Sequence, residues 1–207
     1  MKKIPCLFVR EFVPRANGKG IDAILTRTAA PGLEWVLAGD GIATRKWDGT
    51  ACMVKDGVLH KRYDAKKGKI PPPGAVPCDE PDPVTGHWPH WMAVDKGDPA
   101  SKWHFEAWVK KLTEHGKGTD PGPAFPDGTY ELVGPHVAPH EEHPGYDIFH
   151  RHGADVLSLP AASRTFEGLQ AYFATGNIEG IVFWKDGEPR CKIRRADFGM
   201  PWGGKNR

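Results

Sequence analysis

Short runs in which apolar residues alternate with polar ones recur along the chain, and this alternation is typical of half-buried strands. Two pairs of such runs are separated by Asp-Gly, which strongly favours a tight hairpin turn. Hairpins join antiparallel neighbours, so most of the predicted sheet structure is antiparallel. The strands predicted from these patterns cover residues 5–13, 33–38, 43–54, 58–63, 128–133, 178–184 and 190–195.

Two other segments repeat apolar residues at the spacing of a helix. The first begins at Asp98-Pro99, where aspartate can cap the helix and proline suits the first turn, and it ends at Gly116. The second runs from about Thr165 to Thr175, before Gly176. The residues predicted to face the core are Phe105, Trp108, Val109 and Leu112 in the first helix and Phe166, Leu169, Tyr172 and Phe173 in the second. Strands with a few flanking helices predict an α+β fold with largely antiparallel sheets.

Residues 64–100 break this pattern with many prolines, glycines and charged residues. Pro71-Pro72-Pro73-Gly74 cannot lie in a helix or in a central strand. We therefore expect a long surface excursion here, and long loops are often functional. With 207 residues, the chain is predicted to form a single domain over residues 1–207.

Composition limits the function classes. The formal net charge is only +2, so any site for an anion must be built locally. The four cysteines are scattered without a Cys-x-x-Cys pair, which argues against a zinc ribbon and a disulfide framework. Free thiols fit a reducing, cytoplasmic location, which we expect for this protein. No apolar run approaches the ~20 residues that span a bilayer, so we expect no membrane association.

Candidate chemistry begins with Lys46-Trp47-Asp48-Gly49-Thr50, which by itself is typical of a solvated lysine near a hairpin. Glu131 and Glu179 each place one carboxylate in an otherwise apolar strand, and a buried carboxylate requires a cation or a metal. Lys192 and Arg194 leave the same face of a strand, because side chains repeat every two residues. Two such cations can form a phosphate clamp.

These segments, in this order, resemble motifs of the covalent nucleotidyltransferases, the superfamily of the ATP-dependent RNA and DNA ligases. The resemblance spans residues 5–202. The four matching motifs are motif I at Lys46–Gly49, motif III at Tyr130–Gly134, motif IV at Glu179–Val182 and motif V at Lys192–Arg194. Motif V here is Lys-x-Arg, whereas Lys-x-Lys is frequent in the superfamily.

The chain is also similar to the small 5′–3′ RNA ligases of the vertebrate and viral type. The shared features are Pro5-Cys6-Leu7-Phe8-Val9, Lys46-x-Asp-Gly-Thr, Trp91 and Gly199-x-Pro201-Trp202. This resemblance implies a ligase-type adenylation domain, without the C-terminal OB domain that many ligases carry. It implies that RNA 3′-OH and 5′-phosphate ends are joined through a lysyl-AMP intermediate and an AMP-capped RNA end. The implied cofactors are ATP and Mg²⁺, which Mn²⁺ could replace, and we expect a monomer.

The resemblance also implies roles for individual residues. Lys46 is the nucleophile; an amine must be deprotonated to attack, which nearby cations and partial burial favour. An aromatic side chain is expected to stack on adenine, with Phe149 as the first choice and Phe183 as the competitor. The predicted roles are catalysis for Lys46, Asp48 and Lys192, nucleotide binding for Arg62, Glu131, Phe149, Lys192 and Arg194, metal binding for Glu131 and Glu179, and RNA binding for Lys61, Arg62 and Arg195.

Basic residues gather at 60–69 and in the tail, which ends with Lys205 and Arg207. Either cluster could meet RNA phosphates or be ordinary surface, and for the tail beyond Gly203 ordinary surface is the preferred interpretation. The histidines at 136, 140 and 143 stand among prolines, which is more typical of a loop than of a zinc site. Three alternatives stay open: a DNA ligase, an mRNA-capping guanylyltransferase and a nucleic-acid-binding protein without catalysis.

Overall fold

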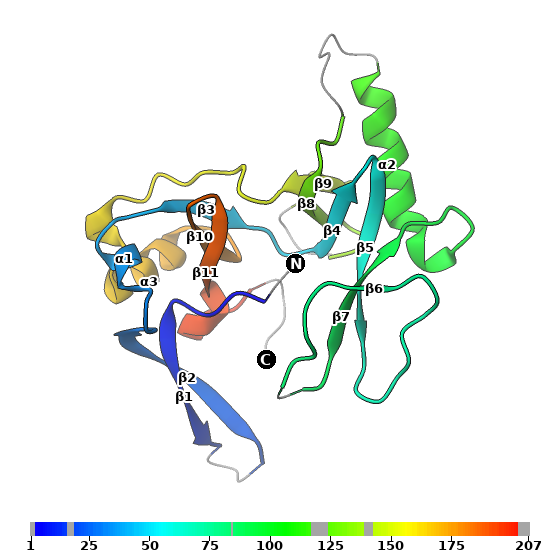
Figure 1. Cartoon of the computed structure of the whole chain (residues 1–207). Helices are drawn as coiled ribbons and strands as arrows, with labels where there is room; N and C mark the ends of the chain where they lie inside the picture. The colour runs from blue at the N-terminus through cyan, green and yellow to red at the C-terminus, as the bar shows by residue number, and fades with distance from the viewer. Residues whose placement is uncertain (1–2, 16–18, 84, 117–123, 139–142, 203–207) are drawn as a thin grey trace. The chain divides into compact units, whose positions relative to one another are not determined.

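The computed structural model describes residues 3–15, 19–83, 85–116, 124–138 and 143–202 (Figure 1). The chain divides into two compact units, one of Met1–Lys3 with Asp48–His152 and the other of Ile4–Trp47 with Gly153–Arg207. Strands predominate, their ladders are antiparallel and few helices accompany them, so the predicted α+β class is confirmed. Among the described residues, no helix is both long and apolar enough to cross a membrane.

The unit built around Asp48–His152 contains one six-stranded sheet in the order β6-β7-β5-β4-β8-β9. Its strands are β4 (Thr50–Lys55), β5 (Val58–Ala65), β6 (Val76–Pro77), β7 (Trp88–Ala93), β8 (Gly128–Val133) and β9 (Ile148–Arg151). The helix α2 (Lys102–His115) follows a 3₁₀ turn, η1 (Pro99–Ser101), and packs Ala107 and Trp108 against the sheet. The buried residues of this core are Cys52, Val54, Leu59, Ala107, Phe125, Tyr130 and Leu132.

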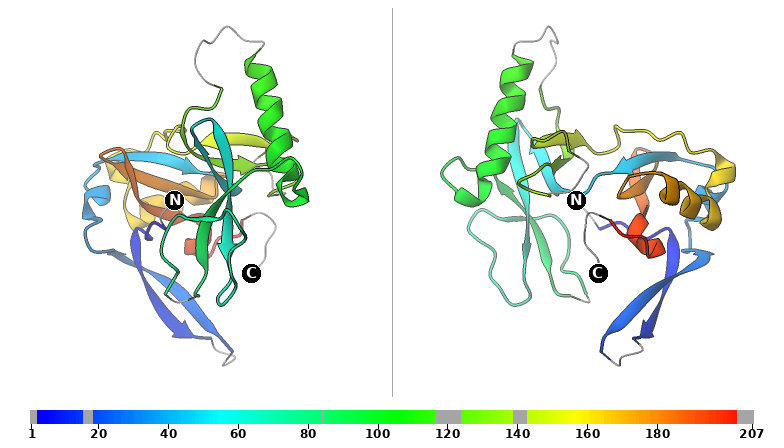
Figure 2. Two further views of the ribbon diagram at one scale, coloured as in Figure 1. Left: turned by 45° about the vertical axis from the view of Figure 1, so that its right-hand side comes forward. Right: turned by 180° about the vertical axis from the view of Figure 1, so that it is seen from behind.

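The other unit contains a three-stranded sheet in the order β11-β10-β3 and a separate hairpin, β1-β2. Figures 1 and 2 show this hairpin extending away from the three-stranded sheet of its own unit. The strands are β1 (Phe8–Pro14), β2 (Ile21–Ala29), β3 (Ile42–Lys46), β10 (Gly180–Lys185) and β11 (Glu188–Arg194). The helical elements are α1 (Glu34–Leu37), η2 (Ala161–Ser163), α3 (Phe166–Thr175) and η3 (Arg195–Phe198). Leu169 and Phe173 of α3 pack on Ile181 and Ile193 of the sheet, all fully buried.

Local sequence signals explain the turns and helix ends. Asp56-Gly57 and Asp186-Gly187 have positive φ at both positions, as a type I′ hairpin turn requires, and they confirm both predicted hairpins. The Thr165 side chain accepts a hydrogen bond from Gly168 N at 3.0 Å and caps α3. Asp98 accepts one from Ala100 N at 3.0 Å and caps the turn that leads into α2.

Two strand predictions were wrong. Residues 33–38 form the short helix α1 instead, because an apolar run of this length does not distinguish strand from helix. The strand predicted over 43–54 is broken at 47–49, and its halves β3 and β4 belong to different sheets. Gly49 lies in this break against the backbone of Leu132, where a side chain would collide with the carbonyl oxygen.

The excursion predicted over 64–100 was wrong in its second half. The strand β7 lies there, between β6 and β5 in the sheet, and its residues His90 and Trp91 are buried. The pattern of apolar and polar residues did not predict this strand, because it contains Pro89 and the polar His90, and proline argues against a central strand. The stripe predicted for the first helix was also partly wrong, since Val109 and Leu112 are about two-fifths exposed.

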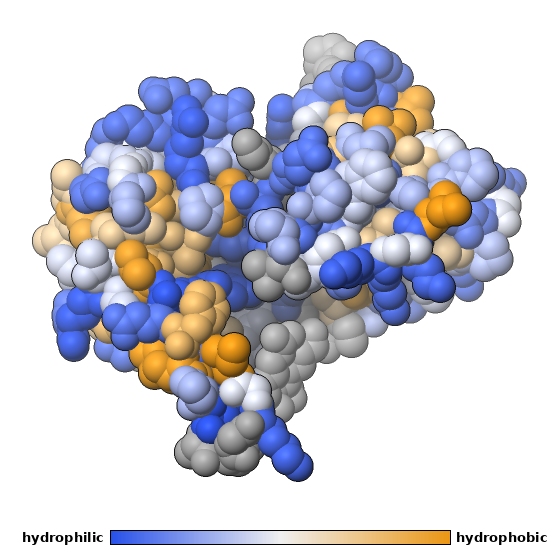
Figure 3. Space-filling view, turned by 60° about the horizontal axis from the view of Figure 1, so that its bottom comes forward, coloured by the Kyte–Doolittle hydropathy of each residue, from blue (hydrophilic) through white to orange (hydrophobic). Residues whose placement is uncertain are grey.

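Apolar side chains remain exposed on the β1-β2 hairpin. Figure 3 shows hydrophobic residues on the surface of the molecule among hydrophilic ones. Among the large hydrophobic residues of the hairpin, Phe12 and Ile21 are the most exposed, at 71% and 65%. A two-stranded hairpin has too little neighbouring structure to bury both of its faces.

Candidate active site

The three-stranded sheet brings three of the predicted basic residues onto one face. Gly180 in the central strand β10 pairs with Arg194 of β11 on one side and with Lys46 of β3 on the other. Two residues further along, Val182 pairs with Lys192. Directly opposed residues point to the same side of a sheet, and the period is two residues. Lys46, Lys192 and Arg194 therefore share a face.

The opposite face of the same sheet enters the hydrophobic core, where Ile181, Phe183, Cys191 and Ile193 are fully buried. This alternation confirms that Lys192 and Arg194 project together from β11. It also rules out Phe183 as an adenine-stacking residue in this conformation, because its ring has no exposed surface.

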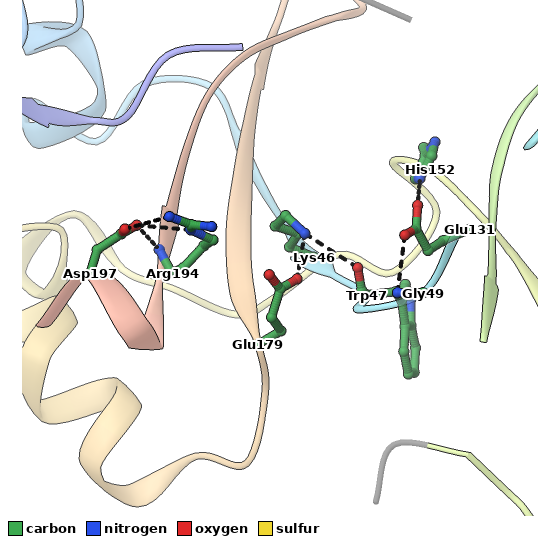
Figure 4. A network of polar contacts seen from close by, with 8 residues as sticks. All are labelled: Lys46, Trp47, Gly49, Glu131, His152, Glu179, Arg194 and Asp197. Carbon is green, nitrogen blue, oxygen red and sulfur yellow. Dashed lines mark hydrogen bonds and ion pairs between the residues drawn. The ribbon is translucent and has the colours of Figure 1, made fainter. Parts of the chain in front are cut away.

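Glu179 stands immediately before β10 and forms an ion pair with Lys46 (Figure 4). Only 9% of Glu179 is exposed, and its backbone oxygen accepts a hydrogen bond from Arg195 N at 2.8 Å. A buried carboxylate without a cation would be costly, so the ion pair accounts for a glutamate in this apolar segment. Lys46 Nζ also donates a hydrogen bond to the Trp47 backbone oxygen at 3.4 Å. Trp47 is the first residue of the segment that connects β3 to β4.

Lys192 lies beside this ion pair in a half-buried position. Burial lowers the pKa of Lys192 to about 8, and the neighbouring charges of Lys46 and Arg194 act in the same direction. Glu179 and Asp197 oppose this shift. The charge of Lys192 is therefore sensitive to pH near neutrality.

Asp197 orients Arg194 and was not predicted from the sequence. The Arg194 backbone N–H donates to Asp197 Oδ2 at 2.9 Å, and Arg194 Nη2 donates to Oδ1 at 2.9 Å (Figure 4). The Asp197 side chain is 5% exposed. Its hydrogen bond raises the pKa of Arg194 further above its ordinary value. In the sequence, the one feature that indicated this contact was an acidic residue three positions after the end of β11.

Asp48 is not part of a strand, although it lies within the strand predicted over residues 43–54. The strand β3 ends at Lys46, and Asp48 lies in the connecting segment at 47–49. Asp48 belongs to the unit built around Asp48–His152. Its catalytic role stays a prediction from the motif alone.

The second group of predicted residues lies in that unit and centres on Glu131 of β8. Glu131 Oε1 accepts from Gly49 N at 3.0 Å, and Oε2 contacts His152 Nε2 at 3.0 Å (Figure 4). His152 Nδ1 in turn contacts Thr129 Oγ1 at 3.0 Å. Glu131 thus links the backbone of Gly49 to β8 through the hydrogen bond that its Oε1 accepts. The sequence indicated histidines near this position but not that His152 would meet Glu131.

Arg62 and Lys61 occupy successive positions of β5 and therefore point to opposite faces of the sheet. Arg62 Nε donates to Asp64 Oδ1 at 2.7 Å. Lys61 is 8% exposed and its Nζ donates to Asp98 Oδ2 at 2.7 Å. This hydrogen bond, with those of Ser101 and Ala100, lowers the pKa of Asp98 to about 2. Contact of Lys61 with RNA would require this ion pair to open.

Two further predicted residues have structural contacts. Phe149 packs edge-to-face on Phe125, with ring centroids 5.2 Å apart, at the border of the core. Arg195 donates through Nη1 to Gly176 O at 2.6 Å and through Nε to Pro201 O at 3.0 Å, which fastens the end of α3. Roles of Phe149 in adenine stacking and of Arg195 in RNA binding stay predictions. The tail residues Lys205 and Arg207 lie outside the described part of the chain.

Glu179 is the described residue whose carboxylate could contribute to binding Mg²⁺. Within the described ranges, no group of three or more His, Cys, Asp or Glu could hold a metal ion by itself. Mg²⁺ usually takes one or two carboxylates and completes its shell with phosphate oxygens and water. Glu179 on the basic face offers such a carboxylate. In Glu131, the other predicted ligand, both oxygens already contact Gly49 and His152.

The basic face and the Glu131 group are thus each defined by named contacts. Lys46, Glu179, Lys192 and Arg194 form the more complete chemical set, because an amine, a carboxylate and two further cations adjoin one another. In comparisons with known proteins, no protein-family model matches the chain and no curated protein matches it.

Proposed function

We propose that the chain is an ATP-dependent RNA ligase with a ligase-type nucleotidyltransferase fold, acting through a lysyl-AMP intermediate. The observation that carries the proposal is the ion pair of Lys46 with Glu179, on the sheet face that also bears Lys192 and Arg194. A protein that only binds nucleic acid has no need of an amine held against a carboxylate in this way. The same set supports nucleotidyl transfer over simple phosphate binding.

In the first step, Lys46 Nζ attacks the α-phosphorus of ATP, an N–P bond forms, and the bond to pyrophosphate breaks. The amine must give up a proton, and Glu179 Oε2 is the hydrogen-bonded group positioned to take it. Lys192 and Arg194 face the same space and balance the charge on the phosphate oxygens. Positioning and electrostatics of this kind dominate phosphoryl chemistry.

Glu179 is the carboxylate that would hold Mg²⁺, together with phosphate oxygens. A bound Mg²⁺ would supply further neutralisation of phosphate charge. In the later steps, the AMP passes from Lys46 to an RNA 5′-phosphate, and the RNA 3′-OH then displaces AMP to form the phosphodiester bond. Roles of Arg62 and Glu131 in nucleotide binding stay predictions from the resemblance.

The test is retention of label on the denatured protein after incubation with Mg²⁺ and α-labelled ATP or, separately, α-labelled GTP. We expect acid-labile, base-stable label from ATP in the wild type and none in Lys46→Ala. Lys185→Ala is the matched control, because Lys185 lies on β10 of the same sheet but pairs with Asp40 at 2.6 Å. It should keep the wild-type label.

Other outcomes separate the alternatives. Label from GTP alone would indicate a capping guanylyltransferase. Label from ATP followed by sealing of nicked DNA but not of RNA would indicate a DNA ligase. No label, with an intact mass that excludes AMP already bound, would overturn the proposal; RNA binding that survives in Lys46→Ala would then indicate a binding protein.

A further inference from the structure

We propose that Arg10 is a second phosphate-binding arginine of this site, held beside Arg194 by the shared carboxylate of Asp197. This inference rests on the proposed function, which supplies the phosphate-bearing substrates. Arg10 is on β1, outside motifs I, III, IV and V, and the sequence analysis assigned it no role. Arg10 and Asp197, the residue it contacts, both belong to the unit that carries Lys46.

The two guanidinium groups meet on one oxygen atom. Arg10 Nη2 donates to Asp197 Oδ1 at 2.6 Å, and Arg194 Nη2 donates to the same atom at 2.9 Å. The two Nη2 atoms therefore cannot be farther apart than the total of these distances, about 5.5 Å. A phosphate group can accept hydrogen bonds from two guanidinium groups at such a separation, because its oxygens diverge from one phosphorus.

Asp197 cannot neutralise both arginines. Its single negative charge is shared between two permanently charged groups, and its side chain is almost completely buried. Of the surrounding charges, Lys46 is paired with Glu179, while Lys192 forms no ion pair of its own within the described residues. The basic face therefore keeps an excess of positive charge, which favours a polyanionic ligand.

Both arginines remain accessible enough to bind a ligand. Asp197 accepts hydrogen bonds from Nε and Nη2 of Arg194 and from Nη2 of Arg10. The Arg194 side chain is 37% exposed and the Arg10 side chain is 29% exposed. The β1-β2 ladder is irregular between Phe8 and Arg10. On either side of this irregularity, Phe8 is buried in the core and Arg10 reaches Asp197.

Asp197 is the positioning residue of this pair. Besides both guanidinium groups it accepts from the Arg194 backbone N–H, so its carboxylate is fixed to the turn η3. A carboxylate held in this way orients the arginines and reduces the rotamer freedom that phosphate binding would otherwise remove.

The experiment compares Arg10→Gln with Arg15→Gln in the full chain by titration calorimetry. Arg15 is on the same hairpin and pairs with Asp22 at 2.8 Å, but both side chains are more than half exposed. The probes are inorganic tripolyphosphate, adenosine, and one RNA oligonucleotide with either a 5′-phosphate or a 5′-hydroxyl. Arg10→Gln should weaken tripolyphosphate binding about tenfold and leave adenosine unchanged, while Arg15→Gln should match the wild type.

The probes distinguish the source of the phosphate. Weakening with tripolyphosphate assigns Arg10 to the phosphates of ATP, and weakening only with the 5′-phosphorylated RNA assigns it to the RNA end. Equal binding of every probe by Arg10→Gln and wild type would overturn the inference. Arg10→Lys should recover part of the loss, because lysine keeps the charge but not the forked geometry.

Asp197→Asn tests the positioning role. It should weaken phosphate binding despite removing a negative charge; tighter binding would mean that Asp197 only competes with the ligand, and would contradict this role. Thermal unfolding must show that the variant folds, and Arg10→Gln decides the matter if it does not. If wild type takes no label from ATP but binds phosphate through Arg10, the proposed function fails and this inference stands.

Discussion

Lys46 and Arg194 stand on opposite sides of Gly180, each paired with it across the three-stranded sheet. The residue between the two cations is thus a glycine, which has no side chain. A Cβ atom at Gly180 would lie 2.6 Å from the Ile193 backbone oxygen and 3.2 Å from Arg194 Cα. The glycine therefore permits the close approach of β10 and β11 at the row that carries both cations.

Gly180→Ala should lower the free energy of unfolding by about 1–3 kcal/mol, because the backbone of β11 must move to accept the methyl group. The measurement is urea denaturation. Gly97→Ala is the control, since its nearest contact would be an ordinary 3.6 Å to Asp95 Oδ1. Wild-type stability in Gly180→Ala would show that the strands relax at no cost.

Glu179→Gln should reduce the rate of ATP-dependent labelling about 100-fold or more, because the amide cannot accept the proton of Lys46. Single-turnover labelling at saturating ATP measures this rate. Glu167→Gln should retain the wild-type rate, since Glu167 forms an exposed ion pair with Arg27. If both variants react alike, Glu179 is not the proton acceptor.

Binding of ATP should weaken as the pH rises through about 8, because Lys192 loses its charge there. Lys192→Arg keeps a positive charge and should bind ATP with little change between pH 7 and pH 9. Fluorescence titration with ATP over this range gives the comparison. A parallel decline in both proteins would assign the titration to another group.

His104 should make the protein sensitive to mild acid. Burial lowers the pKa of His104 to about 4, and Nε2 is buried without a partner among the described residues. The unfolded chain takes up a proton near the ordinary value of 6.5, so stability should fall as the pH drops from 6.5 to 4. His104→Leu should show a smaller fall in Tm over this range.

His60→Leu is the control for this effect, because His60 makes a solvent-exposed contact with the Val58 oxygen. It should show the same fall in Tm as the wild type. An equal fall in His104→Leu would exclude His104 as the cause.

The ion pair of Lys61 with Asp98 should stabilise the fold at pH values where an aspartate of ordinary pKa would already be protonated. The pKa of Asp98 is about 2, below its ordinary 3.8, so its contribution is complete above pH 4 and is lost between about pH 4 and 2. Asp98→Asn should lower Tm at pH 7, because Lys61 stays buried without its carboxylate. Adding Lys61→Met should restore part of the loss, and a further decrease would contradict a specific pair.

Local sequence signals determined the elements that need few distant contacts. Positive φ at Asp56-Gly57 and Asp186-Gly187 is accessible to these residues in any surroundings, so both hairpins follow from the sequence. The capping by Asp98 and Thr165 is equally local. The alternation of Lys192 and Arg194 with two buried residues follows from strand geometry alone. The basic side of β11 was therefore predictable.

Tertiary structure decided which charges meet. The register that places Lys46 and Arg194 about Gly180 depends on pairing between strands more than 130 residues apart in sequence, which no local pattern encodes. The convergence of Arg10 and Arg194 on Asp197, and the burial of Lys61 against Asp98, also depend on long-range packing. Propensity acts over a few residues, whereas the energy of a buried charge depends on every group that surrounds it. The sequence therefore identified the charged residues, and the fold decided which of them are partners.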